Sequence, residues 1–186
     1  MSGPSFIEEY GNSDSDERVD IMLNYFQEFP SIIEGQRKIL VLKIKNEREY
    51  LRQRQNDDLG AVILSSEMSD PTAREAIENV YIEDIVLNGN DISELTHDMK
   101  YGEKRVLHRQ FYILEKMQEE YTILQTQLFF LNSNEKKILE LYTESGHDFQ
   151  KIADQEGIQI ESARRRVWEI RKKIKSKAVN NMSKKI

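Results

Sequence analysis

The side chains with the clearest capacity for chemistry are the basic residues near the C-terminus. Residues 161–186 hold ten lysines and arginines against two glutamates, a net charge of +8, while the other 160 residues carry −14. An acidic chain with one basic end indicates that this end meets a polyanion. A solvated lysine-rich tail would have the same charge, so the arrangement of the bases must decide between the two.

That arrangement favours a helix with one basic face. Ala163, Val167, Ile170 and Ile174 fall on a single stripe when successive residues are turned by about 100°. The opposite face holds Glu161, Arg164, Arg165, Trp168, Lys172 and Lys175, while Arg166, Lys173 and Lys177 flank the stripe. The bases are therefore expected to line the outer face of a helix that starts near Ile160.

Two shorter helices are predicted just upstream. Asn132 and Glu135 have the spacing of a capping box, and Gly146 suits the end of the helix that follows. Asp148 can cap a second helix over residues 149–156. Two short helices joined through a turn that contains glycine match the plan of a helix-turn-helix.

The turn carries the residue types that this plan needs. Gly157 stands where a left-handed backbone is expected, and Ala153 is small enough to let two helices cross closely. Ile158, Ala163 and Val167 can fill the wedge between the helices. Any helical hairpin can hold a glycine turn, so it is the combination that favours a helix-turn-helix. Its last helix is the one that enters the major groove of DNA.

Side chains on this predicted recognition helix have chemistry that suits DNA. Arg164 and Arg165 can each donate two hydrogen bonds to guanine O6 and N7, and Glu161 can accept one from cytosine N4. Ser162 can contact a base or a phosphate. Phosphate contacts, which give affinity without sequence choice, are expected from Lys151, Arg166, Arg171, Lys172 and Lys173. The full set of candidate DNA-contacting residues is Lys151, Gln159, Glu161, Ser162, Arg164, Arg165, Arg166, Trp168, Arg171, Lys172 and Lys173.

Trp168 is the single tryptophan of the chain, and it falls on the polar face of this helix. A structural tryptophan would be expected on the apolar stripe. Two interpretations are open: packing on a long helix predicted over 103–131, which we favour, or direct contact with DNA. The exposure of the ring distinguishes them.

Residues 131–175 resemble region four of bacterial sigma factors and the related helix-turn-helix of phage regulators. The residues that carry the resemblance are the run from Glu135 to Tyr142, then Ile152-Ala153, Gly157-Ile158, Ala163 and Val167. Upstream, Ser69-Asp70-Pro71-Thr72 ahead of a helix is similar to the ArpU-type phage regulators of late or packaging genes. One departure is Gln159, which stands where the family usually has a serine cap.

The resemblance implies a transcriptional regulator that binds double-stranded DNA. The helix matching Ile160–Lys175 would lie in the major groove, and the residue matching Glu161 would contact bases. It also implies contact with RNA polymerase. No segment matches the part of a sigma factor that melts promoters, so activity as a complete sigma factor is not implied.

The rest of the chain is predicted to be helical, giving an all-α protein in which a long helix leads into the helix-turn-helix. We expect a disordered acidic tail over 1–20, a helical body over 21–131, the DNA-binding domain over 132–178 and a flexible basic tail over 179–186. Within the body, helices are expected over 31–55, from Pro71 to Leu87, over 91–97 and over 103–131. The run Ala61-Val62-Ile63-Leu64 fits either a strand or a buried turn of helix.

The helix over 103–131 has the most regular apolar pattern in the chain. Two interleaved sets with seven-residue spacing make an a/d seam of roughly three heptads: Leu107, Leu114, Tyr121 and Leu128, and Met117, Leu124 and Leu131. The seam fits either packing against the helix over 31–55 or a homodimer formed through residues 103–131. The pattern does not separate the two.

Several functional classes are disfavoured. The chain has no cysteine, so it offers no disulfide, thiol nucleophile or thiolate zinc site. Its mean hydropathy is −0.68 and no apolar run approaches 18 residues, so we expect a soluble cytoplasmic protein without a membrane span. Glu94 and His97 have the spacing of a diiron ligand pair, but the second such motif is missing. We expect no enzyme activity, no metal site and no cofactor.

Two alternatives to a regulator stay open. Small terminase subunits of phages also join a helix-turn-helix to an oligomerising helical region, and they mark DNA for packaging. An adaptor that binds a sigma factor or the polymerase through the acidic body is the other. A ring-forming oligomer with weak sequence preference favours packaging, whereas a monomer or dimer with a sharp site favours a regulator.

Overall fold

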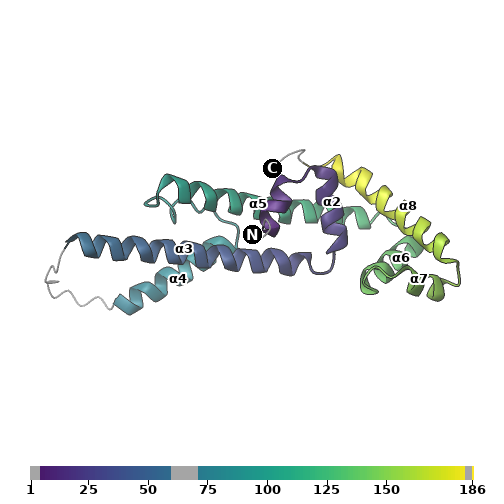
Figure 1. Cartoon of the computed structure of the whole chain (residues 1–186), viewed down its shortest axis with the longest axis horizontal. Coiled ribbons are helices and arrows are strands. Elements are labelled where there is room, and N and C mark those ends of the chain that lie inside the picture. The colour runs from purple at the N-terminus through teal and green to yellow at the C-terminus, as the bar shows by residue number, and fades with distance from the viewer. Residues whose placement is uncertain (1–4, 60–70, 183–185) are drawn as a thin grey trace. The chain divides into compact units, whose positions relative to one another are not determined.

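The computed structural model describes residues 5–59, 71–182 and 186, and in these ranges the regular structure is entirely helical. The predicted all-α class is therefore confirmed (Figure 1). The helices are α1 (Phe6–Asn12), α2 (Ser15–Asn24), α3 (Phe29–Leu59), α4 (Pro71–Leu87), α5 (Tyr101–Leu128), α6 (Ser133–Glu144), α7 (Phe149–Glu156) and α8 (Ile160–Val179). None of the helices in the described ranges is long and apolar enough to cross a membrane.

The chain divides into two compact units. The first, which we call the terminal unit, comprises residues 1–31 and 116–186, and the second, the central unit, comprises residues 32–115. The segment 132–178 thus shares a unit with both the N-terminal helices and the second half of α5. This division differs from the predicted boundary at residue 131. The apolar pattern of one segment shows which of its faces is buried, but it does not show which distant segment packs on that face.

The prediction of a disordered tail over residues 1–20 is wrong for residues 5–20, and residues 1–4 lie outside the described residues. The structure places α1 and α2 there, with Tyr10 and Val19 fully buried. The polar run that suggested disorder is a helix start, since Asp14 and Glu17 form a reciprocal capping box at the head of α2. The prediction rested on local composition and treated the acidic residues of this run as solvated, whereas they begin an ordered helix.

A buried ion pair anchors α2 within the terminal unit. Arg18 on α2 donates from Nε and Nη2 to the two carboxylate oxygens of Glu120 on α5, at 2.8 and 2.9 Å. The hydroxyl of Tyr10 on α1 donates to the same carboxylate at 2.7 Å. Burial raises the pKa of Tyr10, and the neighbouring charge of Glu120 adds to the shift, so the hydroxyl stays protonated and remains a donor. Three segments are thereby joined in one satisfied network.

Aromatic packing surrounds this network. Phe29, at the start of α3, stacks on Tyr121 of α5 with ring centroids 5.4 Å apart. The Tyr121 hydroxyl donates to the backbone carbonyl of Phe26 at 2.9 Å, which satisfies a polar group at the edge of an apolar cluster. The residues of α5 that face α1 and α2 are therefore used for packing inside a single chain.

The heptad seam of α5 is buried in the single chain, which supports intramolecular packing over a homodimer. Leu107, Leu114, Met117 and Leu124 are all buried. In the central unit, Arg37 of α3 donates to Glu115 of α5 at 2.5 Å. These positions would have to leave the chain's own core before they could form a dimer.

The other predicted elements vary in outcome. The α4 helix has the predicted limits, and α3 and α5 differ from prediction by a few residues at each end. Residues 93–98 form turns where a short helix over 91–97 was expected. In the predicted tail over 179–186, Met182 is buried just after α8 ends. Residues 183–185 and the run Ala61–Leu64 lie outside the described residues.

Candidate functional site

The three C-terminal helices form as predicted and lie together (Figure 1). Asn132 and Glu135 make the reciprocal capping box of α6, with hydrogen bonds of 2.8 and 2.9 Å. Asp148 caps α7 by accepting a hydrogen bond from the backbone N–H of Gln150 at 2.9 Å. The starts of α6 and α7 are thus each specified by a side chain within three residues.

The turn between α7 and α8 has the backbone conformation and the buried small residues that the sequence predicts for a helix-turn-helix. Gly157 adopts a left-handed backbone with φ of 63°, where a side chain is unfavourable. Ala153 on α7 and Ala163 on α8 are both buried, together with Val167. Small residues therefore stand where these two helices pack, as the sequence predicts.

The outward face of α8 brings together the residues predicted to contact bases. The side chains of Arg164 and Arg165 are 58% and 80% exposed, and Glu161 and Ser162 are exposed beside them. The predicted stripe on the other side of α8 is buried at all four positions. Burial of one face thus fixes the helix so that the arginines point to solvent.

The exposed arginines make only weak internal contacts. Arg165 pairs with Glu169 at 2.9 Å, and Arg164 lies 3.5 Å from Glu161, each pair within α8. The Arg164 guanidinium also lies 5.5 Å from the centre of the Phe149 ring. Exposed pairs of this kind contribute about 0–1 kcal/mol, so the arginines can exchange them for a ligand at little cost.

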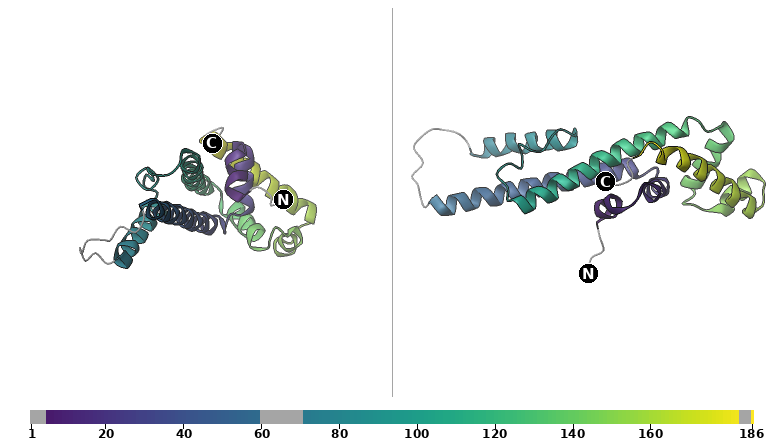
Figure 2. Two further views of the ribbon diagram at one scale, coloured as in Figure 1. Left: turned by 60° about the vertical axis from the view of Figure 1, so that its left-hand side comes forward. Right: turned by 90° about the horizontal axis from the view of Figure 1, so that it is seen from above.

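Arg171 and Lys175, in the second half of α8, are held by the chain itself, whereas Lys172 between them is exposed. Arg171 donates to Asn24 Oδ1 at 2.9 Å and lies 3.4 Å from Asp20, both on α2. Lys175 contacts Asp20 at 2.6 Å and Asp16 at 3.5 Å. Figure 2 shows the C-terminal part of α8 beside α2, and we call this contact the α2 clamp.

Lys173 is also engaged within the chain, through both oxygens of Glu135 at 2.8 Å. The structure therefore does not favour the phosphate-binding roles predicted for Arg171 and Lys173. Their partners lie on α2 and at the start of α6, far away in the sequence, so the pattern of α8 alone could not reveal them.

Acidic residues of α2 are the functional candidates that sequence reasoning missed. Asp16 and Asp20 are four residues apart, so they share one face of α2. Burial acts to lower the pKa of Lys175, but the hydrogen bond and charge of Asp20, with Asp16, outweigh it and raise that pKa. The capping box at Asp14 was the local signal that could have indicated an ordered acidic helix.

The prediction that Trp168 packs on the long α5 helix is wrong. The ring is 59% exposed on the outward face of α8. The Lys172 ammonium group lies 4.8 Å from the centroid of the ring, a cation–π contact between neighbouring turns. Trp168 therefore belongs with the exposed arginines rather than with the core.

The other candidate residues lie around this face. Lys151 on α7 and Lys172 on α8 are exposed. Arg166 is 4.0 Å from Glu156, and its side chain is 44% exposed. Gln159 occupies the cap position of α8 without a side-chain capping bond, so its amide is available to a ligand. We call the set Glu161, Ser162, Arg164, Arg165, Trp168 and Lys172 the α8 face.

No family model, no curated protein and no solved structure matches the chain. The function must therefore be argued from the site. In the ranges that the structure describes, no group of three or more His, Cys, Asp or Glu side chains could hold a metal ion. His97 lies 2.7 Å from Asp98, and Glu94 accepts a hydrogen bond from Tyr81 at 2.8 Å.

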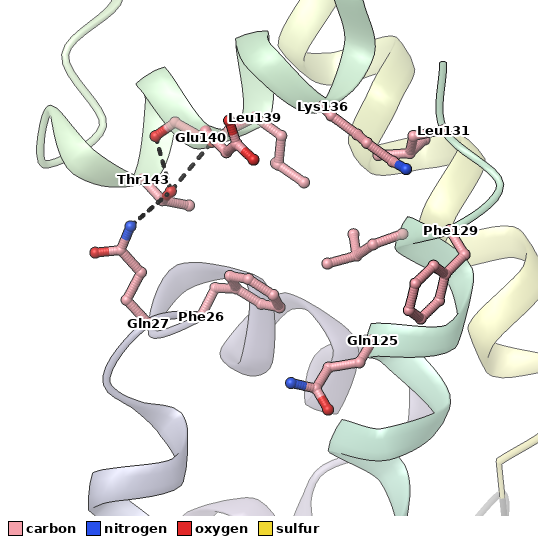
Figure 3. Close-up of a pocket in the computed structure, with 10 residues that line it drawn as sticks. Phe26, Gln27, Gln125, Phe129, Leu131, Lys136, Leu139, Glu140 and Thr143 are labelled. Atoms are coloured by element: carbon pink, nitrogen blue, oxygen red, sulfur yellow. Dashed lines mark hydrogen bonds between the residues drawn. The ribbon is translucent and has the colours of Figure 1, made fainter. Parts of the chain in front are cut away.

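A hollow of about 390 Å³ lies elsewhere in the terminal unit (Figure 3). Phe26, Phe129 and Leu139 contribute to its largely apolar lining. Lys136 and Glu140, which also line it, carry opposite charges. It therefore offers no net positive charge to a polyanion, and the α8 face is the better candidate for binding one.

The contact between Lys173 and Glu135 makes stability depend on pH in a defined direction. The hydrogen bond from Lys173, reinforced by the backbone N–H of Asn132, lowers the pKa of Glu135 in the folded chain. Its contribution is therefore present above the unfolded pKa, about 4.3, and is lost as the pH falls through the folded value. Glu135→Gln should lower the free energy of unfolding by about 0.5–1 kcal/mol at pH 7, because the substitution removes a partly buried ion pair with Lys173.

Urea unfolding at pH 7 and pH 3 checks this prediction, because protonated Glu135 resembles glutamine and the difference should nearly vanish at pH 3. Glu140→Gln, at an exposed position of the same helix, is the matched control and should change little at either pH. An undiminished difference at pH 3 would show that the charge of Glu135 is not responsible.

Proposed function

We propose that this chain is a sequence-specific DNA-binding transcriptional regulator that inserts α8 into the major groove of double-stranded DNA. The observation that carries the proposal is the presentation of Arg164 and Arg165, exposed on the last helix of a helix-turn-helix. A recognition helix contacts bases mainly through its N-terminal residues, and both arginines lie in the first two turns of α8.

The chemistry of each side chain supports a defined role. A guanidinium group matches guanine O6 and N7 with two parallel hydrogen bonds, so Arg164 and Arg165 would each select a guanine. Glu161 would accept a hydrogen bond from cytosine N4, and Ser162 would contact a base or phosphate. Lys151, Arg166 and Lys172 would hold phosphates and so fix the register of α8.

The α2 clamp is consistent with these assigned roles. It occupies Arg171 and Lys175, in the second half of α8, with carboxylates of the same chain. The first half of α8, together with Lys172, then presents the cations that we propose to contact DNA. Contacts with DNA would therefore concentrate near the turn at Gly157, where a helix-turn-helix approaches the groove.

Nothing observed favours DNA packaging over regulation. A packaging protein of this type needs an oligomerising helix, and the seam of α5 is buried inside the single chain. Contact with RNA polymerase, which the resemblance to sigma region four implies, and location in the cytoplasm, which the composition suggests, both stay predictions.

Selection of bound fragments from random duplex DNA tests the proposal, with wild type beside the Arg164→Ala/Arg165→Ala double variant. We expect wild type to enrich one short motif that contains guanine, and the double variant to enrich none. Both side chains are exposed, so the variant should keep the circular dichroism and melting temperature of wild type. A folded wild type that binds without enrichment would refute sequence-specific recognition, and a ring-forming oligomer in that case would support packaging.

A further inference from the structure

Trp168 has no structural role that explains its place on the α8 face. The ring is 59% exposed, whereas the buried side of α8 holds residues such as Val167 and Ile170. A tryptophan has one of the largest apolar surfaces of any side chain, and leaving it in water forgoes the stabilisation that burial would give. An exposed ring among basic groups indicates that a ligand covers it.

The position of Trp168 relates it directly to the two arginines. It follows Arg164 by four residues and Arg165 by three, so it lies about one turn further along the same side of α8. One turn advances 5.4 Å, which corresponds to one or two base pairs at 3.4 Å each. On the proposed function, the ring would therefore meet the groove floor one or two base pairs from a guanine bound by an arginine.

The surroundings of the ring favour an apolar contact at this point. Trp168 lines an open concavity of about 630 Å³ together with Phe149 and Val167. Arg164 and Arg165 line the same concavity and supply exposed hydrogen-bond donors beside the ring. Lys172, whose ammonium group lies 4.8 Å from the ring centroid, takes the cationic position next to it. The ring itself offers an apolar face beside the arginines that we propose to contact bases and the lysine that we propose to contact a phosphate.

Only one group in the major groove is apolar, the C5-methyl of thymine. We propose that Trp168 contacts the C5-methyl group of a thymine one or two base pairs from a guanine bound by Arg164 or Arg165. This inference rests on the proposed function and adds to it a base choice that hydrogen bonding alone does not provide. Trp168 is then a specificity-determining residue.

Deoxyuridine substitution tests the proposal, because uracil lacks the methyl group and keeps the pairing of thymine. Each thymine of the selected site is replaced in turn, and binding is measured for wild type, Trp168→Ala and Lys172→Ala. At one position the replacement should weaken wild type about fourfold, the factor that corresponds to one buried methyl group. The Trp168→Ala variant should bind more weakly and be insensitive to uracil there, whereas Lys172→Ala should keep the sensitivity.

A second readout uses the single tryptophan of the chain, whose fluorescence reports on Trp168 alone. The emission should change on binding the selected site, and less on binding the deoxyuridine version. Equal uracil sensitivity in wild type and Trp168→Ala, no sensitive position, or a selected motif without thymine would each overturn the inference. In those cases the arginine-dependent enrichment would still stand, so failure of this inference is distinct from failure of the proposed function.

Discussion

Replacing Arg18 with leucine should lower the free energy of unfolding by about 3–5 kcal/mol, the cost of leaving one member of a buried ion pair uncompensated. The Arg18 side chain is 0% exposed and Glu120 is 2% exposed. Removing the guanidinium takes away two hydrogen bonds to Glu120 and one to the Ser13 carbonyl. The carboxylate would keep only the Tyr10 hydroxyl as a donor among the contacts described above.

Urea unfolding followed by circular dichroism measures this loss. Arg105→Leu, at an exposed position of α5, is the matched control and should change the free energy of unfolding by less than about 0.5 kcal/mol. The Arg18→Leu/Glu120→Leu double variant should recover much of the loss, because an apolar pair leaves no buried charge. A double variant as unstable as the single one would show that the charge of Glu120 is not the cause.

The second large effect concerns which basic residues of α8 contact DNA. Arg164→Ala and Arg165→Ala should each weaken binding by about 1–3 kcal/mol, and each should relax the preference at the one base it contacts. Arg171→Ala should leave sequence preference intact, because this side chain is only 19% exposed and bonds to Asn24 and Asp20. Its loss should instead lower the free energy of unfolding by about 1–2 kcal/mol.

Fluorescence anisotropy with the selected duplex and its single-base variants measures the first effect, and thermal unfolding measures the second. Lys173→Ala provides a second internally paired residue and should behave like Arg171→Ala, since it loses the contact with Glu135. If Arg171→Ala relaxed sequence choice while Arg165→Ala did not, the assignment of the two halves of α8 would be reversed.

The sequence predicted α6, α7 and α8 well because their limits depend on local chemistry. Asn132 and Asp148 cap helices within three residues, and Gly157 occupies a backbone conformation that few other residues accept. The apolar stripe of α8 also follows from helical geometry alone. The face that carries Arg164 and Arg165 could therefore be predicted without the structure.

What the sequence could not provide depends on contacts between distant segments. The first part of α2, up to residue 20, was predicted to be disordered. Its order depends on Arg18, whose partner Glu120 lies 102 residues away and cannot be found from the local sequence. Arg171 and Lys173 were predicted to hold phosphates. Their carboxylate partners lie on α2 and α6, far away in the sequence, so the prediction could not take these ion pairs into account. The exposure of Trp168 depends on which elements lie nearby. The periodicity of one helix gives only the side of the helix from which the ring projects.

The α2 clamp also has a consequence for how the chain is made. Arg171 is synthesised 151 residues after its partner Asp20. At about 5–20 residues per second, that interval lasts roughly 8–30 s on the ribosome. During this time the carboxylates of α2 have no guanidinium or ammonium group of α8 to pair with. The α2 clamp therefore forms only after α8 has been translated, and a chain released before residue 160 lacks the basic residues of this clamp.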